Sequence, residues 1–119
     1  MIDLIEDDDA VRLSTIAVFE AHGIKIRSHA SAKAFLSAGV RSDCLVVDQH
    51  MPCITGLDLI AELRRSGDNT PAVLITGCES ASIYKRARAY SVPVALKPVP
   101  YGNLIEIIEH LCRPSAEAS

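Results

Sequence analysis

Short apolar runs alternate along the chain with longer segments in which apolar positions recur at helical spacing. The short runs predict five strands, at residues 2–5, 24–27, 44–47, 72–75 and 94–96. The longer segments predict five helices, at residues 10–22, 31–38, 57–65, 80–90 and 103–112. Because each strand is followed by a helix, the pattern favours an α/β domain with a single five-stranded parallel sheet and helices on both faces.

The composition is that of one compact domain. The chain has 119 residues, of which 49% are hydrophobic, which is enough to build a core. We expect the domain to span residues 1–113 and residues 114–119 to form a polar C-terminal tail. The net charge of −3 argues against a nucleic-acid groove, which needs a basic surface. No apolar run approaches the roughly 20 residues of a membrane span, and the N-terminus lacks a signal-peptide pattern, so we expect a cytoplasmic protein.

Four cysteines occur in the chain, and none lies in a CxxC pair: Cys44, Cys53, Cys78 and Cys112. In a reducing compartment we expect all of them to be free thiols. The histidines His22, His29 and His110 are interpreted as residues at helix ends or on the surface.

Polar side chains follow four of the predicted strands at the point where each strand ends. Glu6 and Asp7 follow the first, Asp48 the third, Thr76 the fourth and Lys97 the fifth. Ligands of open parallel sheets bind beyond the carboxyl ends of the strands, so we expect these side chains to converge there. Asp8 and Asp9 are interpreted only as residues that cap the helix that follows.

The converging set has one economical chemical interpretation. Three carboxylates repel one another unless a counter-ion is present, and Mg²⁺ (or Mn²⁺) prefers oxygen ligands. One carboxylate is then available as a nucleophile toward phosphorus, while a hydroxyl and an ammonium group hold the phosphoryl oxygens. Each residue alone has an ordinary explanation, such as a helix cap or a turn. Their occurrence together at four strand ends favours a functional site.

At this point the sequence resembles the receiver domain of bacterial response regulators. The matching pieces are Leu4–Asp8, Leu45–Asp48, Met51-Pro52, Gly56, Val73–Gly77 and Lys97-Pro98. They occur in the family's order and spacing, and the resemblance extends from Asp3 to Leu111. It implies a flavodoxin-like (βα)5 fold with strand order 2-1-3-4-5.

The resemblance also implies roles for individual residues. Asp48 would accept a phosphoryl group from the phosphohistidine of a sensor histidine kinase or from a small donor such as acetyl phosphate. Thr76 would be the switch hydroxyl, and Lys97 would pair with the phosphoryl group. The metal ion would be held by the acidic pair, the acceptor and one backbone carbonyl, namely Glu6, Asp7, Asp48 and His50.

The partners implied are the kinase and a downstream effector or output domain, with a homodimer through the fourth-helix face as a further option. The chain would be free-standing or cut from a longer transcriptional regulator. It would act as a signalling domain with only self-phosphotransfer and slow self-dephosphorylation, and would not bind DNA by itself.

The predicted switching region departs from the family pattern. Val94 stands where the family has an aromatic residue, so an aromatic rotamer flip is absent there. Tyr90-Ser91 replaces a Gly-Ala pair, and we expect Tyr90 to be strained if it has to adopt a positive φ. His50, Cys53 and Cys78 could instead hold a softer ion such as Zn²⁺, although their spacing matches no compact motif.

Three other functions compete with that of a receiver domain. An aspartyl-phosphate phosphatase needs a second acid two residues after the nucleophile, where this chain has His50. A flavin or nucleotide binder needs a first loop rich in Gly or Ser, whereas four acids here would repel phosphate. A phosphorylation-independent pseudo-receiver scaffold would not need the complete set of site residues.

Overall fold

The computed structural model describes residues 1–112 and has the predicted architecture. Its strands are β1 (Ile2–Ile5), β2 (Ile26–His29), β3 (Cys44–Asp48), β4 (Ala72–Thr76) and β5 (Val94–Leu96). Its helices are α1 (Asp9–Ala21), α2 (Ala32–Ala38), α3 (Gly56–Arg65), α4 (Ala81–Ala89) and α5 (Tyr101–Leu111). The strands form one parallel sheet in the order β2-β1-β3-β4-β5, which confirms the predicted fold class. The predicted tail at 114–119, and the domain end at 113, lie outside the described residues.

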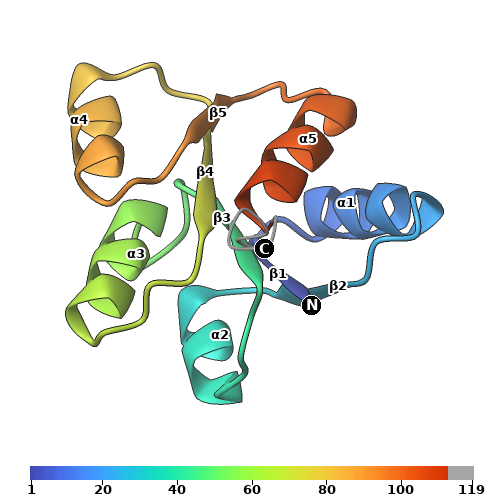
Figure 1. Cartoon of the computed structure of the whole chain (residues 1–119), viewed down its shortest axis with the longest axis horizontal. Helices are drawn as coiled ribbons and strands as arrows, with labels where there is room; N and C mark the ends of the chain where they lie inside the picture. The colour runs from blue at the N-terminus through green and yellow to red at the C-terminus, as the bar shows by residue number, and fades with distance from the viewer. Residues whose placement is uncertain (113–119) are drawn as a thin grey trace, which may run out of the picture.

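Helices cover both faces of the sheet. Figure 1 shows α1 and α5 on one face and α2, α3 and α4 on the other. Alternate residues of β3 point into the two layers, so that Leu45 and Val47 pack under α2–α4 while Val46 packs under α1 and α5. All five residues of β3 are buried, as the apolar run predicted for a strand covered on both faces. None of the helices within residues 1–112 has the length and apolar character that crossing a bilayer demands.

The position of the second strand was predicted wrongly by two residues. The strand was expected at 24–27, but pairing with β1 begins at Ile26, which lies opposite Ile2. The reason lies at the end of α1, where Gly23 has a φ of +74° and the Ile24 amide donates to the Phe19 carbonyl oxygen. Ile24 therefore belongs to the turn that ends the helix and not to the strand. Its apolar side chain packs against the core from that turn.

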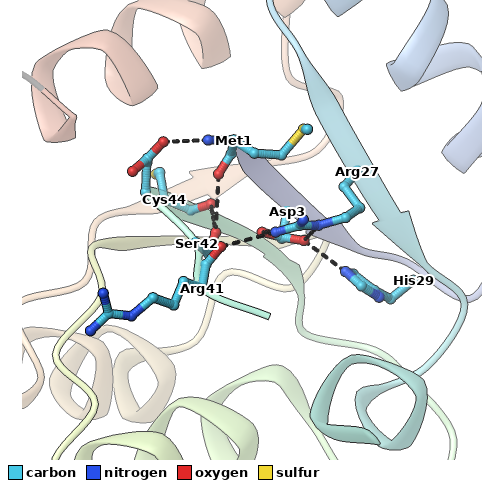
Figure 2. Close-up of polar contacts among 8 residues, drawn as sticks. Met1, Asp3, Arg27, His29, Arg41, Ser42 and Cys44 are labelled. Carbon is cyan, nitrogen blue, oxygen red and sulfur yellow. Dashed lines mark hydrogen bonds and ion pairs between the residues drawn. The ribbon is translucent and has the colours of Figure 1, made fainter. Parts of the chain in front are cut away.

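The shift of β2 brings His29 into the sheet and contradicts its interpretation as a surface or helix-end residue. His29 is buried, and its Nε2 lies 2.8 Å from Oδ1 of Asp3, which is itself completely buried in β1. Arg27 donates two hydrogen bonds to the same carboxylate, from Nε at 2.7 Å and from Nη2 at 3.0 Å (Figure 2). The sequence analysis did not predict this network.

The pKa of Asp3 shows how completely this carboxylate is compensated. Burial alone would raise it, but the hydrogen bonds from Arg27 and His29, the nearby Ser42 hydroxyl and the charge of Arg27 together outweigh the burial and hold the pKa below its ordinary value. Asp3 is therefore a charged group inside the sheet whose charge is matched by its partners in β2.

The end of α4 avoids backbone strain at Tyr90. Tyr90 was expected to be strained only if its φ were positive; its φ is −102°, and the positive value, 58°, falls on Ser91. The Ser91 amide donates to the Arg88 carbonyl oxygen at 3.0 Å, and the Val92 amide donates to Ala87 at 2.9 Å. The left-handed residue thus lies one position later, on a small side chain instead of a bulky aromatic one.

Candidate functional site

The carboxyl edge of the sheet brings the predicted acidic residues together. Glu6 and Asp7 follow β1, and Asp48 is the last residue of the neighbouring strand β3. One oxygen from each of these three carboxylates lies within 4.8 Å of the others. Within residues 1–112 this is the only such group of His, Cys, Asp or Glu side chains. His50, Cys53 and Cys78 do not form a metal-binding cluster there, so the zinc alternative is not supported.

Asp48 is a buried carboxylate, and one of its oxygens accepts no hydrogen bond from the described residues. Its side chain is 4% exposed, and Oδ1 lies 3.0 Å from Nζ of Lys97, which follows β5. Oδ1 accepts no hydrogen bond from the described residues, so the Lys97 contact is an ion pair by distance without hydrogen-bond geometry. A buried carboxylate oxygen with free lone pairs beside two further carboxylates is a fitting ligand for a hard divalent cation.

Lys97 carries the compensating positive charge. Partial burial alone would lower its pKa, but contact with Asp48 and the charges of Glu6 and Asp7 outweigh burial and raise the pKa. Lys97 is therefore a firmly protonated cation at the rim of the acidic cluster.

Glu6 is the most perturbed carboxyl group of the cluster. Burial is the largest cause, and the negative charges of Asp48 and Asp7 add to it, raising the pKa to about 7. The Asp8 amide, which donates to Glu6 Oε2 at 3.1 Å, and the charge of Lys97 oppose this rise without cancelling it. The cluster is thus short of positive charge, which supports the prediction that it binds a divalent cation.

The raised pKa of Glu6 predicts a pH-dependent response to Mg²⁺. Between the ordinary value of 4.5 and about 7, the folded protein binds more protons than the unfolded chain. The free energy of unfolding without metal should therefore fall as the pH rises through this window. Mg²⁺ needs the deprotonated carboxylate, so we expect it to raise the Tm more at about pH 8 than at about pH 6.

The control for this prediction is Glu6→Gln, which cannot titrate. Its Tm without metal should lack the fall between pH 4.5 and about 7 that arises from Glu6. Equal Mg²⁺-induced Tm shifts at both pH values in the wild-type chain would contradict the role given to this side chain.

Thr76 ends β4 with a hydroxyl group that is already engaged. The residue is completely buried, and its Oγ1 accepts a hydrogen bond from the Cys78 amide at 3.0 Å. Oγ1 also lies 3.2 Å from Nε2 of His50. His50 was predicted to act through its backbone carbonyl, and the contact of its imidazole with Thr76 was not foreseen.

Arg12 lies beside the site and was not among the predicted site residues. Its guanidinium donates to the Glu6 carbonyl oxygen at 3.1 Å and to Asp9 Oδ1 at 2.6 Å. It therefore ties the start of α1 to the end of β1. Asp8 caps α1 as expected, because its carboxylate accepts the Val11 amide at 3.0 Å.

Gly56 allows α3 to begin directly against the end of β3. A Cβ at this position would lie 2.6 Å from the Asp48 carbonyl oxygen and 2.8 Å from Cδ1 of Leu74. The Gly56 amide donates to the Gln49 carbonyl oxygen at 3.1 Å, and the Leu57 amide donates to Oε1 of Gln49 at 2.9 Å. These two hydrogen bonds hold the loop after Asp48 against the first turn of α3.

Gly56→Ala is expected to lower the free energy of unfolding by about 1–3 kcal/mol, the usual cost of overpacking a core. The matched control is Gly102→Ala in α5, where a Cβ would meet nothing within 4 Å. This control should be neutral or stabilising by up to about 1 kcal/mol, because alanine is the better helix former. Urea unfolding of both variants tests the prediction, and equal stabilities would refute the close approach described for Gly56.

Comparison with known proteins shows the family of the chain. The response regulator receiver domain model matches residues 2–109. The transcriptional regulatory protein FixJ of Rhizobium meliloti is 32% identical over 111 residues, which cover 91% of this chain and 54% of that protein. FixJ of Azorhizobium caulinodans is 44% identical over 78 residues, or 64% of this chain and 37% of that protein. The chain thus spans about half or less of the length of these relatives.

Solved structures agree with the sequence matches. The structure described as FixJ-N superposes with a TM-score of 0.85 at 28% identity, covering 95% of this chain and 93% of that one. The receiver domain of the Francisella response regulator 1452 gives a TM-score of 0.87 at 23% identity over 96% and 97% of the two chains, which shows the shared fold. The chain belongs to the response regulator receiver domain family, a family of two-component signalling domains rather than of classical enzymes.

Proposed function

We propose that Asp48 accepts a phosphoryl group from the phosphohistidine of a sensor histidine kinase, and that a small donor such as acetyl phosphate can replace the kinase. The observation that carries the proposal is the convergence of the Glu6, Asp7 and Asp48 carboxylates within 4.8 Å, with Lys97 Nζ 3.0 Å from Asp48 Oδ1. Acids on one side and a fixed cation on the other suit transfer of an anionic group to a carboxylate.

The transfer is a substitution at phosphorus. An oxygen of Asp48 forms the new O–P bond while the P–N bond of the phosphohistidine breaks, and the departing imidazole takes up a proton. Glu6, Asp7 and Asp48 would hold Mg²⁺ (or Mn²⁺), with the His50 backbone carbonyl as the further ligand that the family resemblance implies. The ion would neutralise charge on the phosphoryl oxygens. Lys97 stays protonated and pairs with the added phosphoryl group.

Phosphorylation would then shift the chain between two conformations. Thr76 exchanges its contacts with His50 and the Cys78 amide for a hydrogen bond to the phosphoryl group, which displaces the loop before α4. Val94 packs against the α2–α4 side of the core and has no aromatic ring to reorient. The backbone that follows Thr76 therefore moves and alters the surface around α4 and β5. An output domain, an effector or a second copy of the chain binds this surface.

The proposal is tested by incubating the chain with Mg²⁺ and acetyl phosphate and measuring its intact mass. We expect the mass of one phosphoryl group to be added, and EDTA to prevent the addition. Asp7→Asn should raise the Mg²⁺ concentration needed for half-maximal labelling, because it removes one of the three carboxylates that would hold the ion. Asp7 is the exposed member of the acidic cluster, so we expect the change to leave the fold intact. Failure of the wild-type chain to gain mass, or full labelling in EDTA, would refute the proposed chemistry.

A further inference from the structure

Two of the four cysteines lie next to each other at the opposite edge of the sheet from Asp48. Cys44 is the first residue of β3 and is completely buried, whereas Cys112 directly follows α5 and is partly exposed. Both belong to the same packed layer of the core, the one under α1 and α5. They are 68 positions apart in the sequence and share no motif, so the fold alone brings them together.

The contacts around the two thiols are specific. Sγ of Cys112 lies 3.6 Å from the carbonyl oxygen of Asp43, the residue bonded to the Cys44 nitrogen. Sγ of Cys44 in turn lies 3.9 Å from the carbonyl oxygen of Leu45, so both thiols contact the backbone at the start of β3. Cys53 and Cys78, by contrast, are exposed residues in the loops after Asp48 and Thr76.

The backbone that carries Cys44 is held firmly in place. The N-terminal ammonium group of Met1 forms an ion pair with the Asp43 carboxylate. The Ser42 hydroxyl donates to the Cys44 carbonyl oxygen at 2.9 Å (Figure 2). A buried thiol lies here on a fixed strand, and a partly exposed thiol at a helix end contacts the residue just before it in the same core layer. We expect a bond between them to need little movement.

We propose that Cys44 and Cys112 form an intramolecular disulfide under disulfide stress, which fastens the end of α5 to the start of β3. The oxidant is a small disulfide such as oxidised glutathione. The Cys112 thiolate attacks one glutathione sulfur and releases one reduced glutathione. Cys44 then loses its proton to solvent and attacks the Cys112 sulfur, which releases the second. Two protein thiols are oxidised, and one glutathione disulfide is reduced to two thiols.

The environment of the pair sets how readily it reacts. Burial raises the pKa of both thiols, and the Asp43 carboxylate raises that of Cys112 further, while the Met1 ammonium and the Cys44 thiol oppose this. The reactive thiolate is therefore scarce at neutral pH, so we expect the exchange to be slow there and to become faster as the pH rises.

The test uses Cys53→Ser/Cys78→Ser protein, which keeps only the Cys44 and Cys112 thiols. The folded protein is equilibrated with oxidised and reduced glutathione in a mildly alkaline buffer, quenched with acid and analysed by intact mass and non-reducing peptide mapping. We expect the loss of two hydrogen masses with no glutathione retained, and one peptide pair joined through Cys44 and Cys112. With glutathione below millimolar concentration, the joined form should exceed the glutathione adduct by about tenfold.

The control is the same protein with the added change Cys112→Ser, which replaces a partly exposed thiol and should show no joined peptides. Cooperative thermal unfolding of each reduced protein verifies that it is folded, and the oxidised pair should raise the Tm of the test protein. A stable glutathione adduct on Cys112 without the joined pair would overturn the proposal. So would a disulfide that lowers the Tm, or an absence of reaction under excess oxidised glutathione.

Discussion

Asp48→Asn is expected to abolish phosphoryl transfer to the chain. The substitution keeps the size and shape of the side chain but replaces the carboxylate nucleophile with an uncharged amide. It also removes one negative charge from a site in which three carboxylates lie within 4.8 Å of one another. The variant should therefore fold at least as stably as the wild-type chain in the absence of metal, so that loss of transfer cannot be attributed to unfolding.

The matched control is Asp8→Asn, the same chemical change in the neighbouring acidic run. Asp8 caps α1 through its side chain, and asparagine is an equally good helix cap. Labelling by acetyl phosphate, followed by intact mass, should be complete for the control and absent for Asp48→Asn. Equal labelling of wild type and Asp48→Asn would place the acceptor elsewhere and remove the basis of the proposed function.

Asp3→Ala is expected to be the most destabilising substitution among the polar residues of the sheet. It removes the carboxylate that compensates Arg27 and His29, and it leaves Nε of Arg27 and Nε2 of His29 without this partner next to β1. Breaking a buried charged network by removing one partner costs about 3–5 kcal/mol. We expect the lower end, about 3 kcal/mol, because the Arg27 side chain is 34% exposed and can turn toward water.

The test of this prediction is urea unfolding at neutral pH. The pKa of Asp3 lies below its ordinary value of 3.8, so its contribution to stability is present above that value and is lost as the pH falls through the folded pKa. The wild-type chain should therefore lose its stability advantage over Asp3→Ala in strong acid. Asp9→Ala is the control, since its exposed ion pair with Arg12 should be worth at most about 1 kcal/mol. A cost below that of the control would refute the network's role.

The architecture could be predicted because local patterns determine it. The run Cys44–Val47 is apolar throughout, and in the structure it is the central strand, buried on both faces. Glu6, Asp7 and Asp48 could be placed near one another because the topology sends the ends of β1 and β3 to the same edge. Residue type and strand order were sufficient for both results.

The network around Asp3 could not be predicted because it depends on register. Asp3 meets Arg27 only because Ile2 pairs with Ile26, and the sequence alone placed the second strand two residues too early. Ile24 caused the error. The hydrophobic pattern of the sequence is the same whether an apolar residue after a helix ends a turn or begins a strand. With that register, His29 was left outside the sheet and its partner was not recognised.

The contact between His50 and Thr76 has a consequence for the resting equilibrium. Because the hydroxyl of Thr76 already has partners, its proposed move to the phosphoryl group would exchange one set of hydrogen bonds for another, and such exchanges are nearly balanced in free energy. In the unmodified chain no phosphoryl oxygen replaces the lost partners, so we expect the resting form to be favoured there by about 1–3 kcal/mol. A small fraction of unmodified chains should then occupy the active form. A partner that binds this form would then increase its population without any phosphoryl donor, and would in turn favour phosphorylation of Asp48.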